Sequence, residues 1–497
     1  MKKNKIYIGG GFTEDQLLWI VPIVSYYSKK NSNNLFIFEN ELSKTFLNNR
    51  VIRTHLKNVE HIVQKDLYFF SSKLIKYFLI LFKYLPQIFF YVLFVNRKSI
   101  LKDKKDWFTL QLKHSFWDTS LNMAKDGEIE PTLINKFISI IRCYAALELA
   151  NKIHKTGVCT VFLGHTVYAS RTLLAYLREK QIKIFTQASF NLHYQPKSED
   201  NSWLKISKKK LETVRKKVNF QIISNYFNKR TMGKGNYLDS QIAMKQKKNI
   251  QKLNNFNVLF LHVFKDSPFN VIDKNRIFTD YYEWVIETLK IIKNSDQLWV
   301  IRLHPSSKRW GENQLKTLET IFKIIFKNKL PPKNIIIDEG AYSNNFLIKE
   351  SNKILTFNGS VQLESACYGK RSITISSNLS EIDKNLNLCP RNISEYKKLL
   401  LMDQNIFMGI AKISNVKIRI SKYILFIREN LHYLKKDLNS LEIYRNDGNK
   451  LRTKTYNDIS KKLDFNKKLF KRNGENLRNG ATHTISSKYM EYFDILK

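Results

Sequence analysis

The sequence contains few cysteines, and their positions exclude two kinds of site. Four of its 497 residues are cysteine, and no two of them form a Cys-x-x-Cys pair. We therefore expect neither a zinc site built on paired cysteines nor a small fold held by disulfides. Thiols spaced in this way indicate a reducing compartment. The four are Cys143, Cys159, Cys367 and Cys389.

Long uncharged apolar runs are also lacking. The most apolar segment, residues 67–95, is interrupted by lysines, and its longest uncharged part, 84–96, is shorter than the ~20 residues that a membrane-spanning helix needs. The apolar run after Lys5 is too short for an export signal, so we expect a first strand there. Segment 67–95 has two interpretations. One is a buried or interdomain helix pair broken near Pro86, and the other is an interfacial helix that docks on a bilayer.

Acidic residues are about half as frequent as basic ones. Lysine and arginine total 84 against 43 aspartates and glutamates, which gives a formal net charge of +41. Such an excess can bind polyphosphates, but the basic residues are scattered over the chain, without a zinc-finger spacing or an RNP-like aromatic motif. We therefore expect no nucleic-acid partner. A basic surface beside an anionic inner leaflet of a membrane is the consequence we favour.

The hydrophobic pattern predicts two α/β domains. A chain of 497 residues exceeds what one core usually holds. Strand-like and helical stretches alternate over residues 1–195 and again over 255–410, whereas 196–254 is lysine-rich and weakly apolar. We predict an N-terminal α/β domain, a helical connector, a C-terminal α/β domain and a helical tail over 411–497. In such folds, ligands bind at the carboxyl ends of the strands.

Two apolar strands of the C-terminal half end in polar residues. Residues 298–303 form a strand that Pro305 cannot continue, so His304 is expected at its carboxyl end. Residues 353–357 form a short strand, which is followed at 358–360 by a tight turn and the start of a helix. The N–H groups at a helix start suit a phosphate or a carboxylate. Together the two strand ends predict one ligand site.

These segments and several others match a known family. They are residues 258–266, Trp284, 299–305, 358–364 and 368–370, with weaker matches at 115–119, 164–168 and Arg171. On them, the chain resembles bacterial capsule and surface-polysaccharide biosynthesis proteins of the GT-B fold, a group that includes the Kdo transferases of capsule synthesis. Its His-Pro element is also similar to one in bacterial sialyltransferases. The match is good over roughly residues 255–380.

The resemblance implies an α/β protein of the GT-B class, with two Rossmann-like doubly wound domains facing each other across a cleft. It also implies a glycosyltransferase that moves a sugar from a nucleotide sugar, CMP- or UDP-linked, to a polysaccharide or glycolipid acceptor of the capsule or O-antigen type. The protein would be cytoplasmic, with peripheral attachment to the inner membrane face as an alternative. A catalytically inactive nucleotide-binding or regulatory protein of polysaccharide assembly is the second functional interpretation.

For the donor, the resemblance implies particular roles in the C-terminal domain. His304 would contact the phosphate or the base and ribose, and Glu364 would accept hydrogen bonds from a ribose hydroxyl. Arg302 or Lys370 would stabilise the negative charge that builds on the departing phosphate. No Asp-x-Asp motif is present, so we expect no metal ion and no cofactor beyond the nucleotide sugar. The expected donor residues are Arg302, His304, Pro305, Asn358, Gly359, Ser360, Glu364, Lys370 and Asp266.

The catalytic base is expected from the N-terminal domain, because it must take a proton from the acceptor hydroxyl. Asp118 is the first candidate, Asp15 or Glu14 the second, and His165 the third. Gly10, Gly11 and Glu14 are expected on the acceptor side. Each has a structural alternative: a helix N-cap or solvated acid for Asp118, a satisfied buried histidine for His165, and a tight turn for the glycines. Residues 186–190 lack the acidic residue that Kdo transferases carry in an N-terminal segment, which argues against CMP-Kdo as donor.

Overall fold

The computed structural model describes part of the chain, and every statement below concerns that part. The described residues are 4–9, 34–39, 61–64, 73–100, 107–164, 167–188, 191–195, 208–234, 242–244, 253–267, 276–328, 330–375 and 384–429.

The N-terminal half contains a sheet with the strand order of a dinucleotide-binding fold. Among the described residues it has six strands in the order β3-β2-β1-β4-β5-β6. The first five are parallel, and β6 is antiparallel to β5. The register places Ile6 opposite Phe36 and Ile8 opposite Phe162. The strands are β1 (Asn4–Gly9), β2 (Asn34–Glu39), β3 (His61–Gln64), β4 (Thr160–Leu163), β5 (Lys183–Ala188) and β6 (Asn191–Gln195).

The C-terminal half repeats this topology in a second, all-parallel sheet. Its five described strands have the order β11-β10-β7-β8-β9, so the chain starts at the centre, builds outward on one side and then crosses to the other. Buried apolar residues run along its strands, as expected when helices cover both faces. The strands are β7 (Phe256–Phe260), β8 (Leu298–Arg302), β9 (Ile335–Asp338), β10 (Ile354–Thr356) and β11 (Ile373–Thr374).

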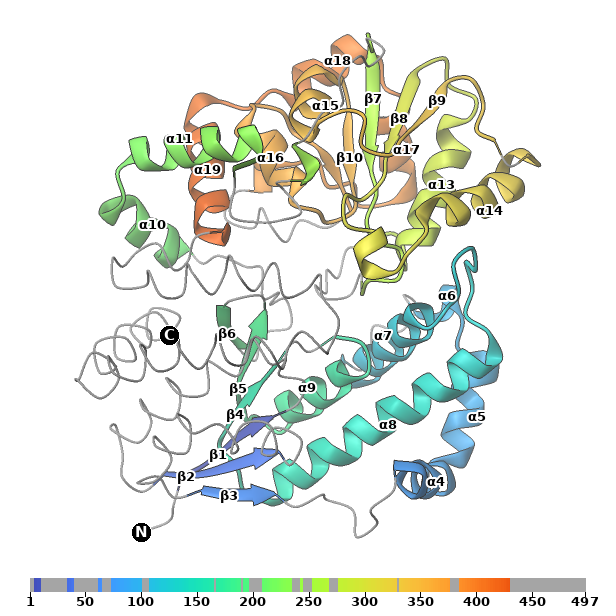
Figure 1. The fold of residues 1–497 in the computed structure, drawn as a ribbon, viewed down its shortest axis with the longest axis vertical. Coiled ribbons are helices and arrows are strands. Elements are labelled where there is room, and N and C mark those ends of the chain that lie inside the picture. Colours follow the sequence, from blue (N-terminus) through green and yellow to red (C-terminus); the bar gives the residue numbers. More distant parts are fainter. Residues whose placement is uncertain are drawn as a thin grey trace, which may run out of the picture.

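Helices flank both sheets (Figure 1). Local capping sets several of their starts: Asp280 accepts from the Glu283 amide before α13, and Asn313 accepts from the Lys316 amide before α14. In the N-terminal half the helices are α4 (Lys73–Lys83), α5 (Leu85–Phe94), α6 (Arg97–Ile100), α7 (Trp107–Asn122), α8 (Leu133–Lys155) and α9 (Ser170–Glu179). In the C-terminal half they are α13 (Tyr281–Ile292), α14 (Gln314–Phe326), α15 (Asn344–Glu350), α16 (Val361–Cys367), α17 (Ile393–Leu401) and α18 (Gln404–Ala411).

Two further groups of helices lie beside the C-terminal sheet. The connector forms α10 (Lys208–Lys217), α11 (Phe220–Lys229) and the π-helical turn Arg230–Lys234. The helix α19 (Asn415–Glu429) packs against α16 and against both connector helices. The predicted fold class is confirmed: the chain is α/β, with two Rossmann-like doubly wound units.

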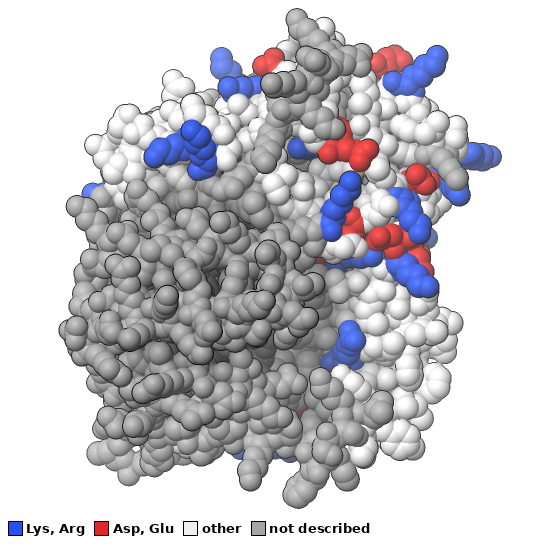
Figure 2. Space-filling model, viewed as in Figure 1, with Lys and Arg blue, Asp and Glu red and all other residues white. Residues whose placement is uncertain are grey.

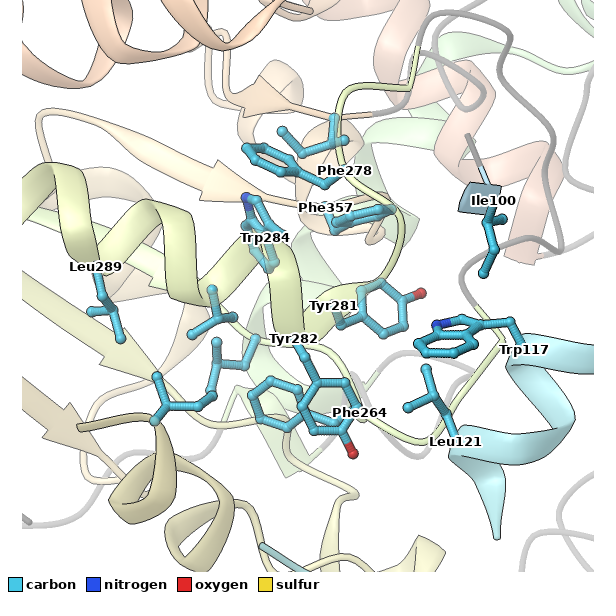
Figure 3. Packing of buried hydrophobic residues seen from close by; sticks show 14 of the residues in the cluster. Ile100, Trp117, Leu121, Phe264, Phe278, Tyr281, Tyr282, Trp284, Leu289 and Phe357 are labelled. Atoms are coloured by element: carbon cyan, nitrogen blue, oxygen red, sulfur yellow. The ribbon is translucent and has the colours of Figure 1, made fainter. Parts of the chain in front are cut away.

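The two halves share one apolar core. Trp117 and Leu121 of α7 belong to the same buried cluster as Tyr281 and Trp284 of α13, and Figure 3 shows the side chains of α7 directed toward those of α13. The indole Nε1 of Trp117 donates a hydrogen bond to Asp280 Oδ2 at 2.9 Å. Because these contacts join α7 to the start of α13, residues of the two sequence halves contribute to one interior.

The described part of segment 67–95 is a bent helix pair that is buried on its inner side and exposed on its outer side. Within it, α4 and α5 are separated at Tyr84. Among the described residues no single helix is long and apolar enough to cross a membrane, while the pair 77–83 and 85–94, bent by 86°, passes the same test of length and composition. The inner side of the pair, with Ile80 and Ile88, is buried as the first interpretation expected, whereas Phe82 and Phe94 on the outer side are 65% and 63% exposed.

The excess of basic residues is dispersed on the face that Figure 2 shows. There, lysine and arginine side chains of the described residues are separated from one another, and several lie next to acidic side chains on the side where the two halves meet. Elsewhere in the described residues, basic side chains also pair with acidic ones, as Lys265 does with Asp126, with 2.7 Å between Nζ and Oδ1. On this face, the described part of the molecule presents mixed charge.

Candidate functional site

The carboxyl ends of β7 and β10 lie side by side at the centre of the C-terminal sheet. These strands pair with Phe260 opposite Thr356, and the strand order reverses between them, which is where doubly wound sheets bind ligands. His262 follows β7, and its Nε2 atom lies 3.2 Å from Thr356 Oγ1. The backbone N–H of Asn358 donates to the same Nε2 atom at 3.4 Å. The turn after β10 is therefore held against the end of β7.

His304 joins this cluster through Gln314, the first residue of α14. Its backbone N–H donates to Gln314 Oε1 at 2.8 Å, and the Gln314 side-chain amide donates to the His262 carbonyl at 2.6 Å. The structure thus places the two predicted strand ends in one site, with the end of β7 between them. These residues remain accessible to a ligand, since six of them are partly exposed: His262, His304, Pro305, Asn358, Gly359 and Ser360.

His262 is a neutral imidazole in this setting. Its ring stacks on Tyr281, with centroids 4.8 Å apart and an interplanar angle of 5°. Burial and, to a smaller extent, the nearby His304 lower the pKa of His262 to about 3. The Tyr281 hydroxyl donates to Asn358 Oδ1 at 3.2 Å. His262 therefore offers hydrogen bonding without a charge, and Tyr281 fixes both the ring and the turn.

Gly359 packs closely against the two residues that support the turn. A Cβ atom at this position would lie 2.9 Å from Thr356 Oγ1 and 3.1 Å from the His262 ring. The Gly359 amide donates to Thr356 Oγ1 at 3.3 Å. Glycine is required here because of this close approach, and any side chain would displace the turn from the end of β7.

Two cations expected in the donor site have structural roles instead. Arg302 Nη1 and Asp338 Oδ2 form a buried ion pair at 2.9 Å, and Asp338 Oδ1 also accepts from backbone amides after β9. The Lys370 ammonium donates to the carbonyls of Ile348 and Ser351, at 3.1 and 2.8 Å. These carbonyls lie at the end of α15, just before β10 begins. They are therefore at the amino ends of the strands, whereas His304 lies at the carboxyl ends. Neither cation faces the strand-end cluster.

Glu364 is buried and engaged by the connector. Its Oε1 atom accepts from Arg230 Nη2 at 2.9 Å and from the Ser360 hydroxyl at 2.8 Å. Arg230 is itself 2% exposed, because it lies in the π-helical turn that follows α11. The ion pair ties the connector to α16 and positions Ser360, so a ribose contact by Glu364 would have to accommodate Arg230.

A buried acid lies at the boundary between the two halves. Asp118, in the middle of α7, is 1% exposed, so it is neither an N-cap nor a solvated acid. Its Oδ2 atom accepts a hydrogen bond from the Ser267 hydroxyl and lies 3.6 Å from Arg171 Nη1. The Ser267 amide donates to Asp266 Oδ1 at 2.8 Å, and the Tyr168 hydroxyl donates to the same oxygen at 3.4 Å. Residues from α7, α9 and the loop after β7 thus form one polar cluster.

Asp118 has the electrostatics of a proton acceptor near neutral pH. Burial raises its pKa to about 7, and this effect exceeds the lowering by Arg171 and by the Ser267 hydrogen bond. The loop after β7 connects this acid to the strand-end cluster, because it carries both His262 and Ser267. Tyr281 stacks on His262, and burial, together with the charges of Asp266 and Asp118, raises the pKa of Tyr281.

Arg276 is a cation of this region that the sequence did not predict. Its guanidinium lies 5.2 Å from the centre of the Phe357 ring, immediately before the Asn358 turn. Its charge also acts on Asp118, on Tyr281 and on His114. His114 was missed too, although its spacing of four residues before Asp118 puts both on one helix face. For Arg276 the sequence carried no signal, because it belongs to neither a strand end nor a motif.

Several predicted residues lie outside the described part of the chain. They are Gly10, Gly11, Glu14, Asp15 and His165. The ends of β1 and β4 that lead into them are described, and the two strands are neighbours at the N-terminal switch point. Among the described residues, no three His, Cys, Asp or Glu side chains are grouped to hold a metal ion.

Comparison with known proteins finds similarity in solved structures. No family model and no curated protein matches the chain. A UDP-GlcNAc 2-epimerase from Methanocaldococcus jannaschii, solved with UDP-GlcNAc and UDP, is 14% identical with a TM-score of 0.28, covering 87% of this chain and 100% of its own. The UDP-GlcNAc 2-epimerase from Neisseria meningitidis is 11% identical, with a TM-score of 0.25 and coverage of 86% and 99%. The glycosyltransferase SnogD from Streptomyces nogalater is 7% identical, with a TM-score of 0.23 and coverage of 87% and 100%. At these values none of the three assigns a substrate or a reaction to this chain.

Proposed function

We propose that this chain is a glycosyltransferase that takes a sugar from a nucleotide sugar and transfers it to a surface polysaccharide or glycolipid of the capsule or O-antigen type. One observation carries the proposal. Partly exposed polar groups at three strand ends, including His262, His304 and Asn358, converge at the switch point of the C-terminal sheet, and the loop that begins at His262 also carries Ser267, which donates to the buried acid Asp118. A ligand site and a proton acceptor are thus joined by one loop.

In this proposal the strand-end cluster binds the nucleotide and its phosphates. His304 and the polar groups of residues 358–360 donate hydrogen bonds to the phosphates, and Glu364 positions Ser360. Arg276 replaces Arg302 and Lys370 as the cation that stabilises the leaving phosphate, because it lies beside Phe357 at the same strand end. The protein supplies this charge from its own side chains, and the proposed reaction uses no metal ion.

Asp118 is the proposed base. The acceptor hydroxyl oxygen attacks the anomeric carbon, the bond from that carbon to the phosphate oxygen breaks, and the hydroxyl proton passes to Asp118. A carboxylate with a pKa of about 7 suits this task, since about half of it is ionised at neutral pH and the ionised form is basic enough to take the proton. Ser267 and Arg171 hold the carboxylate in place and would exchange one contact for the acceptor. The donor sugar is CMP- or UDP-linked in this proposal, and the reaction takes place on the cytoplasmic side of the membrane.

A second candidate function is supported by the burial of the same acid. Asp118 is 1% exposed and engaged by Ser267 and Arg171, and Glu364 is engaged by Arg230. Both contacts fit a protein that binds a nucleotide sugar without transferring the sugar, in a regulatory role in polysaccharide assembly. The two functions differ in turnover and agree in nucleotide binding.

A thermal-shift screen followed by a transfer assay separates them. CMP, UDP, GDP and TDP sugars are added to the full chain, and a ligand at 100 times its Kd is expected to stabilise the folded state by about 2.7 kcal/mol. His304→Ala is expected to abolish the shift. Transfer of the sugar to a polysaccharide acceptor supports the enzyme, whereas a shift without turnover supports the binding protein. Absence of stabilisation by every nucleotide sugar would contradict both.

A further inference from the structure

The outer face of α4 and α5 is an exposed apolar surface. Nine large apolar side chains of these two helices are more than a third exposed. On soluble proteins, contiguous apolar surfaces of this kind mark sites where another apolar partner is bound. The nine, defined here as the elbow surface, are Ile75, Phe78, Leu79, Phe82, Leu85, Phe89, Phe90, Leu93 and Phe94.

The inner face of the same helices is anchored in the N-terminal half. Ile80, Ile88 and Tyr91 are buried in the main core, and α5 packs along α8. At the bend between the helices, the Tyr84 ring stacks on Tyr144, with centroids 4.2 Å apart, and the Lys83 ammonium pairs with Glu148 at 2.6 Å. Because these contacts hold the bend in place, the elbow surface is presented by a fixed scaffold. In Figure 1, α4 and α5 lie at the edge of the N-terminal half, on the side of α8 away from the sheet.

Helix α5 is apolar on all sides. Such a helix is normally enclosed by protein or by membrane, yet α7 and α8 enclose only its inner side. With ten residues, α5 is about 15 Å long, half the ~30 Å of a bilayer's hydrocarbon layer. The bend of 86° prevents α4 from continuing its direction. The geometry therefore suits a surface that enters one leaflet and lies in its interface.

Charge identifies the kind of apolar partner. Residues 67–102 contain six basic residues and no acidic one. A second copy of this chain docking by the same surface would bring two such segments together, and their like charges would repel. An anionic lipid headgroup layer complements them, with about 1 kcal/mol gained per lysine or arginine near the surface. Arg97 is bound by Asp280 and Glu130 within the protein, so the residues of this segment that can serve the headgroups are its five lysines, Lys73, Lys76, Lys83, Lys98 and Lys102.

We propose that the elbow surface docks this protein on an anionic lipid membrane, with the phenylalanines of α4 and α5 inserted among the acyl chains and the lysines of segment 67–102 at the headgroups. The start of α8 extends the surface, since Leu133 and Ile134 are also exposed there. The Lys136 ammonium connects this end of α8 to α5 by donating to the Val95 carbonyl at 3.3 Å. The proposal concerns a lipid surface and does not depend on the proposed transferase activity.

Vesicle co-sedimentation of the full chain tests the proposal. The protein is expected to bind vesicles of phosphatidylcholine mixed with phosphatidylglycerol more tightly than vesicles of phosphatidylcholine alone, and added salt should weaken the binding. The double variant Phe82→Ser with Phe94→Ser is expected to bind at least about tenfold more weakly, because each inserted ring contributes through its buried apolar area. Ile406→Ser is the matched control, since Ile406 is equally exposed on α18 of the other half, and it should bind as the parent protein does.

A second measurement keeps the test independent of folding. A Phe90→Trp variant should show a blue-shifted emission on the mixed vesicles and quenching by brominated acyl chains, whereas Ile406→Trp should show neither. The proposal is overturned if the parent protein does not sediment with the mixed vesicles, or if the double variant sediments as well as the parent. A dimer that the double variant dissociates, without vesicle binding by the parent, would assign the elbow surface to a second copy instead.

Discussion

The carboxylate of Asp118, on α7 of the N-terminal half, accepts a hydrogen bond from the hydroxyl of Ser267, which follows β7 of the C-terminal half. The two residues are 149 positions apart in the chain. Arg171 completes the contact, with its Nη2 donating to Ser267 Oγ at 3.4 Å. The proposed base is therefore held by residues of both halves, and its ionisation depends on how the halves pack together.

Replacing Asp118 by asparagine tests its role as a base. Asp118→Asn keeps the shape of the side chain and is expected to lower kcat by about 10²- to 10⁴-fold, while the thermal shift by the nucleotide sugar persists. Ser267→Ala is the control for packing and should reduce kcat far less, because the carboxylate remains. Unchanged turnover by Asp118→Asn would assign the acid a purely structural role.

The pH dependence of turnover and of stability should both follow Asp118. Because the base acts when ionised, the rate should rise as pH increases through about 7 and then level. The pKa is raised in the folded state, so the stability associated with the protonated acid is present at low pH and is lost as pH rises toward and through 7. Denaturant unfolding across this range should show a smaller decrease for Asp118→Asn than for the parent. Equal slopes would contradict the raised pKa.

Two arginines offer a matched comparison of catalysis with stability. Arg276→Met is expected to reduce kcat by about 10²- to 10³-fold. Arg302→Met leaves Asp338 buried without its partner and should lower the free energy of unfolding by about 3–5 kcal/mol. Steady-state kinetics of both variants measures the loss of turnover, and denaturant titration measures the loss of stability. A kcat loss confined to Arg302→Met would reverse the assignment of the phosphate-facing cation.

Gly359→Ala should disturb the donor site directly. Its Cβ would meet Thr356 Oγ1 and the His262 ring, so the turn must shift, at an expected cost of about 1–3 kcal/mol in stability. Binding of the nucleotide sugar should weaken at least tenfold in calorimetric titration. The control is Gly409→Ala in α18, where a Cβ would meet no atom within 4 Å and helix propensity is expected to add up to about 1 kcal/mol of stability. If both variants bind the donor normally, the turn is not part of the site.

Asp280 is expected to stabilise the contact between the two halves. It caps α13 and accepts from Trp117 and from Arg97 Nε, the latter at 2.8 Å. Asp280→Ala removes the cap and the acceptor of Trp117 and of Arg97 Nε, while Arg97 keeps its ion pair with Glu130, so the free energy of unfolding should fall by about 1–3 kcal/mol. Chemical denaturation followed by tryptophan emission measures this loss. Retention of parental stability would show that the interface does not rely on this residue.

Much of the architecture could be predicted from local patterns. The helix at 314–326 and the strand ends before His304 and Asn358 follow from the period of apolar residues and from proline, asparagine and glycine at the boundaries. Elements without a clear period were missed. One is α7, which carries Asp118 and is buried on many sides, so its apolar residues do not mark a single face.

The sequence by itself determined the two doubly wound units and the placement of polar residues at their strand ends, because both depend on hydrophobic periodicity and turn residues within short windows. Tertiary structure alone decided which charges face the site. Arg302 forms an ion pair with Asp338, and Lys370 donates to backbone carbonyls at the amino ends of the strands. Arg276 lies beside Phe357, next to the site. The partners of each charge come from distant segments, and burial, which no local window records, sets whether an acid such as Asp118 holds a proton near neutral pH.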